Sequence, residues 1–145
     1  RADIKSAVEN GLPTAAECGG FRYLHDPLAG LPMAGAIPGA AYRTDRLQRF
    51  GYVTLTARRD NLRCRAGESI RAHEFHYYDN QDCGDGFRGE RASGGSAYAC
   101  VHATGTLYAG FPHLYLPANS AFAESFLRRA AEYTPPAKVA GGAGC

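Results

Sequence analysis

The chain has 145 residues, 45% of them hydrophobic and 21% charged, which is the composition of a folded globular domain and not of a disordered chain. The net charge of +2 is too small to indicate a nucleic-acid-binding protein. No run of about 18 apolar residues predicts a membrane span, and the N-terminal residues lack the apolar segment of a signal peptide.

Cysteine usage and the first residue add two expectations. The cysteines stand at positions 18, 64, 83, 100 and 145, and no two have Cys-x-x-Cys spacing. An odd number without that spacing argues against a disulfide framework and a zinc ribbon, so we expect reduced thiols in a cytoplasmic enzyme. The chain begins with Arg1 and its only methionine is Met33, so we expect a fragment, a processed product or an incomplete gene model.

Apolar periodicity and turn residues predict short elements in the N-terminal half. We expect a helix over residues 2–10, a strand over residues 12–16 and a second helix over residues 21–24. Residues 33–37 are expected to form a short strand between two proline-containing turns.

The rest of the chain is richer in strands. Strands are expected at residues 52–56, 70–78, 97–103 and 107–111, and a helix at 120–133. The polar, glycine-rich residues 80–96 are expected to form a loop with at most one hairpin turn, and residues 135–145 a disordered tail. This pattern predicts one α/β domain over residues 1–134, with a mixed central sheet flanked by helices.

A candidate nucleophile stands at Cys18, between a short apolar strand and the start of a helix. A nucleophile elbow needs this order, with small residues such as Ala16 and Gly20 on either side so that strand and helix pass closely. The N–H of Gly19 is free to approach a developing oxyanion, and the start of a helix favours a thiolate. The same residues also fit a buried cysteine beside an ordinary pair of glycines.

Four further patterns follow one another along the chain: AECGG (16–20), RTDRLQRFGYV (43–53), RAHEFHYY (71–78) and YAGFPHLY (108–115). In this order they resemble the C-terminal class I glutamine amidotransferase domain of cobyrinate a,c-diamide synthases. The resemblance covers most of the chain from Gly11 to Tyr133. The alanine–glutamate pair before the cysteine and the His-Glu-Phe-His stretch favour this family over the related cobyric acid synthases.

The resemblance implies a flavodoxin-like fold that is incomplete at its N-terminus, and cleavage of the side-chain amide of glutamine. In that reaction Cys18 attacks the carbonyl carbon, and His113 takes the thiol proton and then protonates the departing ammonia. The N–H of Gly19 is one oxyanion donor, and the family's second donor lies upstream of residue 1.

The resemblance also implies a synthetase domain that is absent from this sequence. That domain uses ATP and Mg²⁺ to activate the carboxylates of a corrinoid substrate in cobalamin biosynthesis, while this chain binds glutamine and holds no cofactor or metal. Two alternatives stay open: the same glutaminase serving another tetrapyrrole or acid, and a truncated, non-catalytic interaction module.

The sequence departs from many class I amidotransferases at Tyr115. They carry a glutamate two residues after the histidine, and that glutamate orients the imidazole. We therefore expect a Cys–His dyad, and the sequence does not name the group that orients His113.

Two further patterns concern binding. His73 and His76 in the His-Glu-Phe-His stretch are expected to face opposite sides of a strand, which disfavours a shared zinc ion and favours a structural strand or a wall of the substrate-facing cleft. Arg43, Arg46 and Arg49 either form a solvated surface or face the synthetase domain, where arginine can bind corrinoid carboxylates.

Overall fold

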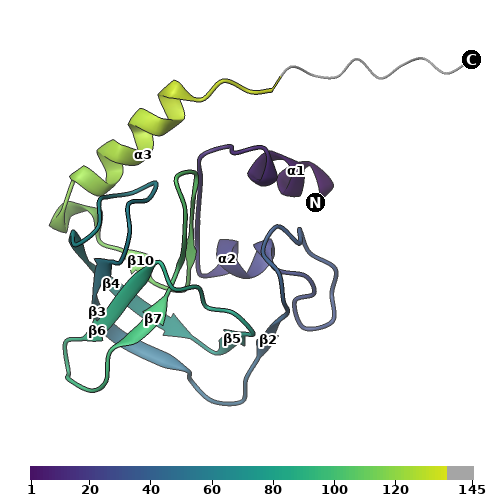
Figure 1. Ribbon diagram of the computed structural model, residues 1–145. Coiled ribbons are helices and arrows are strands. Elements are labelled where there is room, and N and C mark those ends of the chain that lie inside the picture. Colours follow the sequence, from purple (N-terminus) through teal and green to yellow (C-terminus); the bar gives the residue numbers. More distant parts are fainter. Residues whose placement is uncertain (137–145) are drawn as a thin grey trace, which may run out of the picture.

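The computed structural model describes residues 1–136, and Figure 1 shows its labelled helices above the strands of the larger sheet. Helix α3 (Ala121–Glu132) lies at the upper left of this view, and α1 (Ala2–Glu9) and α2 (Gly19–Leu24) lie to the right. Most of the tail expected over residues 135–145, namely residues 137–145, lies outside the described residues.

The N-terminal elements confirm the types predicted from the sequence. Helix α1 is followed by β1 (Thr14–Glu17), and α2 begins two residues after β1 ends. Gly11 follows α1 with a φ of +80°, a backbone conformation that a residue without a Cβ adopts at little cost. The predicted strand over residues 12–16 is displaced by only one or two residues.

A three-stranded sheet, ordered β1-β9-β8, contains the one parallel pair among the described strands. Strand β9 (Leu107–Gly110) runs parallel to β1 and antiparallel to β8 (His102–Ala103), and Glu17 pairs with Gly110. Because parallel strands end at the same edge of a sheet, the residues that follow Glu17 and Gly110 leave the sheet close together.

A five-stranded antiparallel sheet has the order β10-β4-β3-β6-β7. Its strands are β3 (Arg49–Ala57), β4 (Ser69–His76), β6 (Phe87–Arg91), β7 (Tyr98–Cys100) and β10 (His113–Leu114). Side chains alternate along β3 and β4, so that Leu55 and Ile70 are buried while Phe50 and Tyr52 are exposed. The sheet therefore has one buried face and one face open to solvent.

The remaining elements connect these sheets. Strand β2 (Ala41–Arg43) pairs antiparallel with β5 (Tyr78–Asn80), and a short 3-10 helix, η1 (Leu116–Ala118), leads into α3. Phe87, Tyr108 and Phe122 are fully buried in one core, under α3, and Phe21 and Phe111 belong to a second core around α2. The second core holds the strand–turn–helix unit around Cys18 in place.

The expectation of a strand over residues 33–37 is wrong. Instead, the N–H groups of Ala34, Gly35 and Ile37 donate to the carbonyls of Tyr23, His25 and Leu24 at the end of α2. The segment thus supplies hydrogen-bond donors to the last carbonyls of a helix. In a strand, the same N–H groups would instead bond to a neighbouring strand. Gly35, with a φ of +67°, makes the bend that this path requires.

The expectation of a loop over residues 80–96 is wrong for its central part, because β6 lies there and pairs with both β3 and β7. Phe87 supplies a fully buried side chain. The Tyr98 ring packs in the space that a side chain at position 89 would fill, because a Cβ on Gly89 would lie 2.7 Å from the ring. Glycine here marks close packing on a strand and not a turn.

The predicted strand over residues 97–103 is divided into β7 and β8 at Val101, whose φ is +68°. The α/β class with mixed sheets is confirmed, and the arrangement is compatible with a flavodoxin-like amidotransferase domain. Within residues 1–136, no helix has the length and apolar character that crossing a membrane requires.

Candidate active site

Cys18 is the single residue between β1 and α2, and its backbone is strained. Its φ of +46° lies in a region that residues with a Cβ rarely adopt, and such strain concentrates at functional sites. A Cβ on Gly20 would lie 3.6 Å from the Cβ of Ala16, so the strand and the helix pass at van der Waals distance. The local geometry is that of the strand–turn–helix predicted from the sequence.

Gly19 is the first residue of α2, and the first N–H groups of a helix have no partner within the helix. The carbonyl of Cys18 accepts the N–H of Arg22 at 3.0 Å, which closes the first turn. The hydrogen bonding of α2 therefore does not use the N–H of Gly19. This N–H can donate to an oxyanion, because an oxyanion donor must not already be bonded within the protein.

His113 reaches the same edge of the fold from the other strand of the parallel pair. Strand β9 ends at Gly110, the buried Phe111 and Pro112 follow, and His113 is the first residue of β10. The Cys18 N–H donates to the Gly110 carbonyl at 2.9 Å, so the elbow is bonded to the backbone three residues before His113. The structure thus brings the segments that carry Cys18 and His113 to the same edge of the fold.

Glu17, which sequence reasoning did not name as a site residue, contacts His113 directly. Its Oε2 lies 3.6 Å from His113 Nδ1, and its Oε1 accepts the N–H of Leu114 at 3.4 Å. The side chains of Glu17 and His113 are 29% and 49% exposed. The one signal in the sequence was the position of Glu17 directly before the candidate nucleophile.

The His-Glu-Phe-His stretch lies on β4 and alternates as predicted. His76 and Glu74 point into the core, where His76 stacks on Phe111 with ring centroids 3.9 Å apart. Burial lowers the pKa of His76. His73 lies on the opposite face, so the two histidines do not share a metal site.

The outward face of β3 and β4, together with the residue that follows β4, carries five aromatic side chains, which we call the aromatic face: Phe50, Tyr52, His73, Phe75 and Tyr77. Their rings form edge-to-face pairs with centroids 5.5–6.1 Å apart. Tyr52 is 75% exposed. His113 pairs with His73 across β10 and β4, and directly opposed residues project to the same side of a sheet. The candidate catalytic histidine therefore borders the aromatic face.

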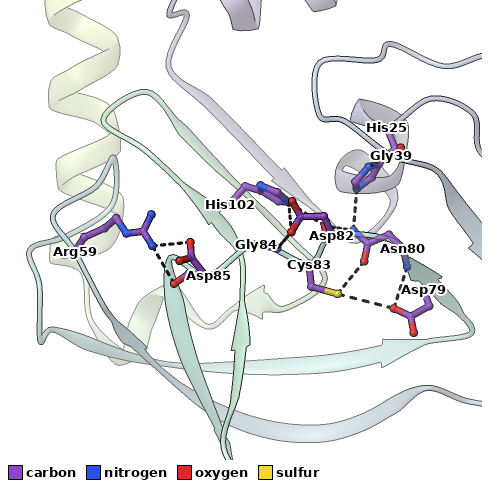
Figure 2. A network of polar contacts seen from close by, with 10 residues as sticks. All are labelled: His25, Gly39, Arg59, Asp79, Asn80, Asp82, Cys83, Gly84, Asp85 and His102. Atoms are coloured by element: carbon purple, nitrogen blue, oxygen red, sulfur yellow. Dashed lines mark hydrogen bonds and ion pairs between the residues drawn. The ribbon is translucent and has the colours of Figure 1, made fainter.

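The described cysteines other than Cys18 lie in protected surroundings. Burial raises the pKa of Cys64 and Cys83 to about 11 and that of Cys100 to about 12. Figure 2 shows Cys83 in a polar network in which its thiol contacts Asn80 Oδ1 at 2.8 Å. These thiols are structural.

The same network holds a fully buried histidine, His25, in one tautomer (Figure 2). Its Nδ1 lies 3.1 Å from the carbonyl of Gly39, which only accepts, so Nδ1 carries the proton. Its Nε2 then accepts from Nδ2 of Asn80 at 3.0 Å. Both ring nitrogens have hydrogen-bond partners within the protein, and burial lowers the pKa of His25. This histidine therefore stabilises the loop and is not available to bind a substrate.

We expect Cys18 to react with iodoacetamide at pH 7 much faster than Cys64, Cys83 and Cys100. The thiolate is the reactive form, and a pKa of about 11 leaves a thiolate fraction of about 1 in 10,000 at pH 7. Peptide mapping after brief labelling measures the four rates. Cys83 is the matched control because it is partly exposed, as Cys18 is. Equal labelling of these two cysteines would contradict an activated thiol at position 18.

A pocket of about 860 Å³ lies elsewhere, between α3 and the loop that joins β3 to β4. Polar and charged side chains line it, among them Arg63, Glu68 and Arg128, but neither Cys18 nor His113 does. The strained turn at Cys18 and the strand end that carries His113, and not this pocket, locate the candidate site.

Comparison with known proteins identifies the family, although no protein-family model matches the chain. A cobyrinate a,c-diamide synthase of Methanothermobacter thermautotrophicus is 33% identical over 136 residues, which are 92% of this chain and 30% of that protein. One of Picrophilus torridus is 31% identical over 88% of this chain and 28% of its own length. One of Caldanaerobacter subterraneus subsp. tengcongensis is 44% identical over 52% of this chain and 18% of its own length.

The chain spans less than a third of the length of each of these three relatives. The similarity to several synthases of one kind agrees with the elbow at Cys18 and with the α/β fold. The chain therefore belongs to the cobyrinate a,c-diamide synthase family.

Proposed function

We propose that this chain is the glutaminase part of a cobyrinate or hydrogenobyrinate a,c-diamide synthase and supplies ammonia for amidation of corrin carboxylates in cobalamin biosynthesis. The observation that carries the proposal is the hydrogen bond from the Cys18 N–H to Gly110, at 2.9 Å. It ties the strained turn that holds the thiol to the strand end that delivers His113. The relatives' name supplies the class of substrate.

In the proposed reaction His113 accepts the thiol proton, and the Cys18 sulfur forms a bond to the amide carbon of glutamine. The negative charge that develops on the amide oxygen is stabilised by the N–H of Gly19. His113 then donates the proton to the nitrogen, the carbon–nitrogen bond breaks, and ammonia leaves. Water, deprotonated by His113, hydrolyses the thioester, releasing glutamate and restoring the thiol.

Amidation itself belongs, in this proposal, to the part of the family's proteins that this chain does not span. That part would use ATP and Mg²⁺ to activate the corrinoid carboxylates. Of the three arginines considered for contacts with it, Arg49 packs over the ring of Tyr98, 3.7 Å from the centroid. Arg43 and Arg46 are exposed, so these two are the arginines we propose to face that part of the enzyme.

We expect the isolated chain to release ammonia from glutamine slowly, and its Cys18→Ala variant not at all above background. We propose that a second oxyanion donor lies in the part of the family's proteins that this chain does not span. The loss of one such donor typically lowers the rate roughly 100- to 1000-fold. A coupled ammonia assay compares the chain, its variant and a complete synthase. Full-enzyme rates from the chain alone would contradict the expectation, as would equal rates for the chain and the variant.

A further inference from the structure

The residue directly before the candidate nucleophile is in contact with the candidate base. Glu17 ends β1, and its two carboxylate oxygens reach toward β10. Oε2 lies 3.6 Å from His113 Nδ1, and Oε1 accepts the Leu114 N–H at 3.4 Å. Within residues 1–136, no other carboxylate lies within 4 Å of a nitrogen of His113.

The side chain that stands two residues after His113 does not take this role. Tyr115 is 60% exposed, and its N–H donates to the carbonyl of Arg71 at 2.9 Å. His73 faces His113 across the sheet, but an imidazole is a poorer partner for a developing imidazolium than a carboxylate is. Glu74 points into the core, where it accepts the Tyr98 hydroxyl.

We propose that Glu17 is the positioning residue that orients His113, so that one short segment supplies both the nucleophile and the group that aligns its base. The proposal rests on the proposed glutaminase function. A carboxylate beside Nδ1 favours the tautomer with the proton on Nδ1, which leaves the lone pair of Nε2 to accept the thiol proton. The same carboxylate stabilises the imidazolium that forms after the transfer.

The fold holds the Glu17 side chain in place from several directions. Its backbone is fixed by pairing with Gly110 in the parallel ladder, and one carboxylate oxygen is held by the backbone of β10. Arg63, which is only 7% exposed, lies within electrostatic range. Burial lowers the pKa of the Arg63 guanidinium, and the Glu17 carboxylate opposes that shift. Glu17 thus contacts the histidine and the backbone of β10, and a buried cation lies within electrostatic range of it.

Nitrogen-15 NMR of the His113 ring in the 145-residue chain tests the proposal without an activity measurement. The Glu17→Gln variant keeps an oxygen to accept the Leu114 N–H and places an NH₂ group where the second carboxylate oxygen faced Nδ1. An NH₂ group donates, so it favours a proton on Nε2 and not on Nδ1. We expect the neutral ring of His113 to carry its proton on Nδ1 in the native chain and on Nε2 in the variant. A His113→Asn sample assigns the signals.

Kinetics of glutamine hydrolysis give a second readout. We expect Glu17→Gln to lower kcat by about 10- to 100-fold with KM unchanged, because general acid–base catalysis contributes at least about 100-fold and a misoriented base loses part of it. The matched control is Glu9→Gln, the same chemical change at an exposed glutamate of α1 that contacts Lys5. It should change neither kcat nor the tautomer.

An unchanged His113 tautomer in Glu17→Gln would overturn the proposal, and so would an unchanged kcat. Thermal unfolding of the variant, compared with the native chain, shows whether a lower kcat comes from a loss of folded protein. The outcome is separable from the proposed function, because residual glutamine hydrolysis in Cys18→Ala refutes the function, while the NMR result judges Glu17 alone.

Discussion

We expect that alanine in place of Cys18, in a complete synthase with this chain as the proposed glutaminase part, abolishes amidation with glutamine and leaves amidation with added ammonium intact. This is the largest effect that we expect on activity. Removal of a nucleophile lowers the rate of such hydrolases by at least about 10⁴-fold. Added ammonium should bypass the step, because we propose that the carboxylate chemistry takes place in the part of the family's proteins that this chain does not span.

The measurement is diamide formation with glutamine or with ammonium chloride as the nitrogen source. We expect His113→Asn to behave as Cys18→Ala does. Tyr115→Phe is the control, because its exposed phenol faces solvent and the substitution should change little. Loss of ammonium-dependent amidation in a folded Cys18→Ala enzyme would show that the two chemistries are not divided as proposed.

We expect alanine in place of Gly84 to destabilise the chain strongly, and more than alanine in place of Gly94 does. Gly84 has a φ of +75°, and a Cβ there would overlap the backbone carbonyl carbon of Val101 and the amide nitrogen of His102. Backbone atoms cannot move aside as a flexible side chain can. We expect the free energy of unfolding to fall by about 2 to 4 kcal/mol, from overpacking and left-handed strain together.

Gly94→Ala is the matched control for Gly84→Ala. Gly94 has a similar φ of +85°, but a Cβ there would meet nothing within 4 Å. It reports the conformational cost alone, about 1 kcal/mol. Urea unfolding of both variants measures the difference, and equal destabilisation would mean that the close contact at Gly84 with the turn at Val101 does not form.

The features of the fold that could be predicted from the sequence are those that depend on residues close together in the chain. The strand, the turn and the helix around Cys18 are local, and so are the small residues at positions 16 and 20 that let them pack. The alternation that separates His73 from His76 is also local, because it follows from strand geometry alone. These predictions needed no knowledge of the rest of the fold.

The features that sequence reasoning missed depend on partners far away in the chain. Residues 87–91 form a central strand because β3 and Tyr98 surround them, although their glycines suggest a loop. Residues 33–37 were predicted as a strand but bind the end of α2. Glu17 and His113 are 96 residues apart, and only the parallel register of β1 and β9 shows that they meet.

Mass spectrometry of the chain, quenched in acid during incubation with glutamine, tests the central claim most directly. The covalent intermediate of the proposed reaction is a γ-glutamyl thioester, and acid preserves thioesters while it stops turnover. We predict an added γ-glutamyl group on the peptide that contains Cys18, and its disappearance in Cys18→Ala. A γ-glutamyl group on another cysteine would contradict the account, as would glutamine turnover that persists in Cys18→Ala.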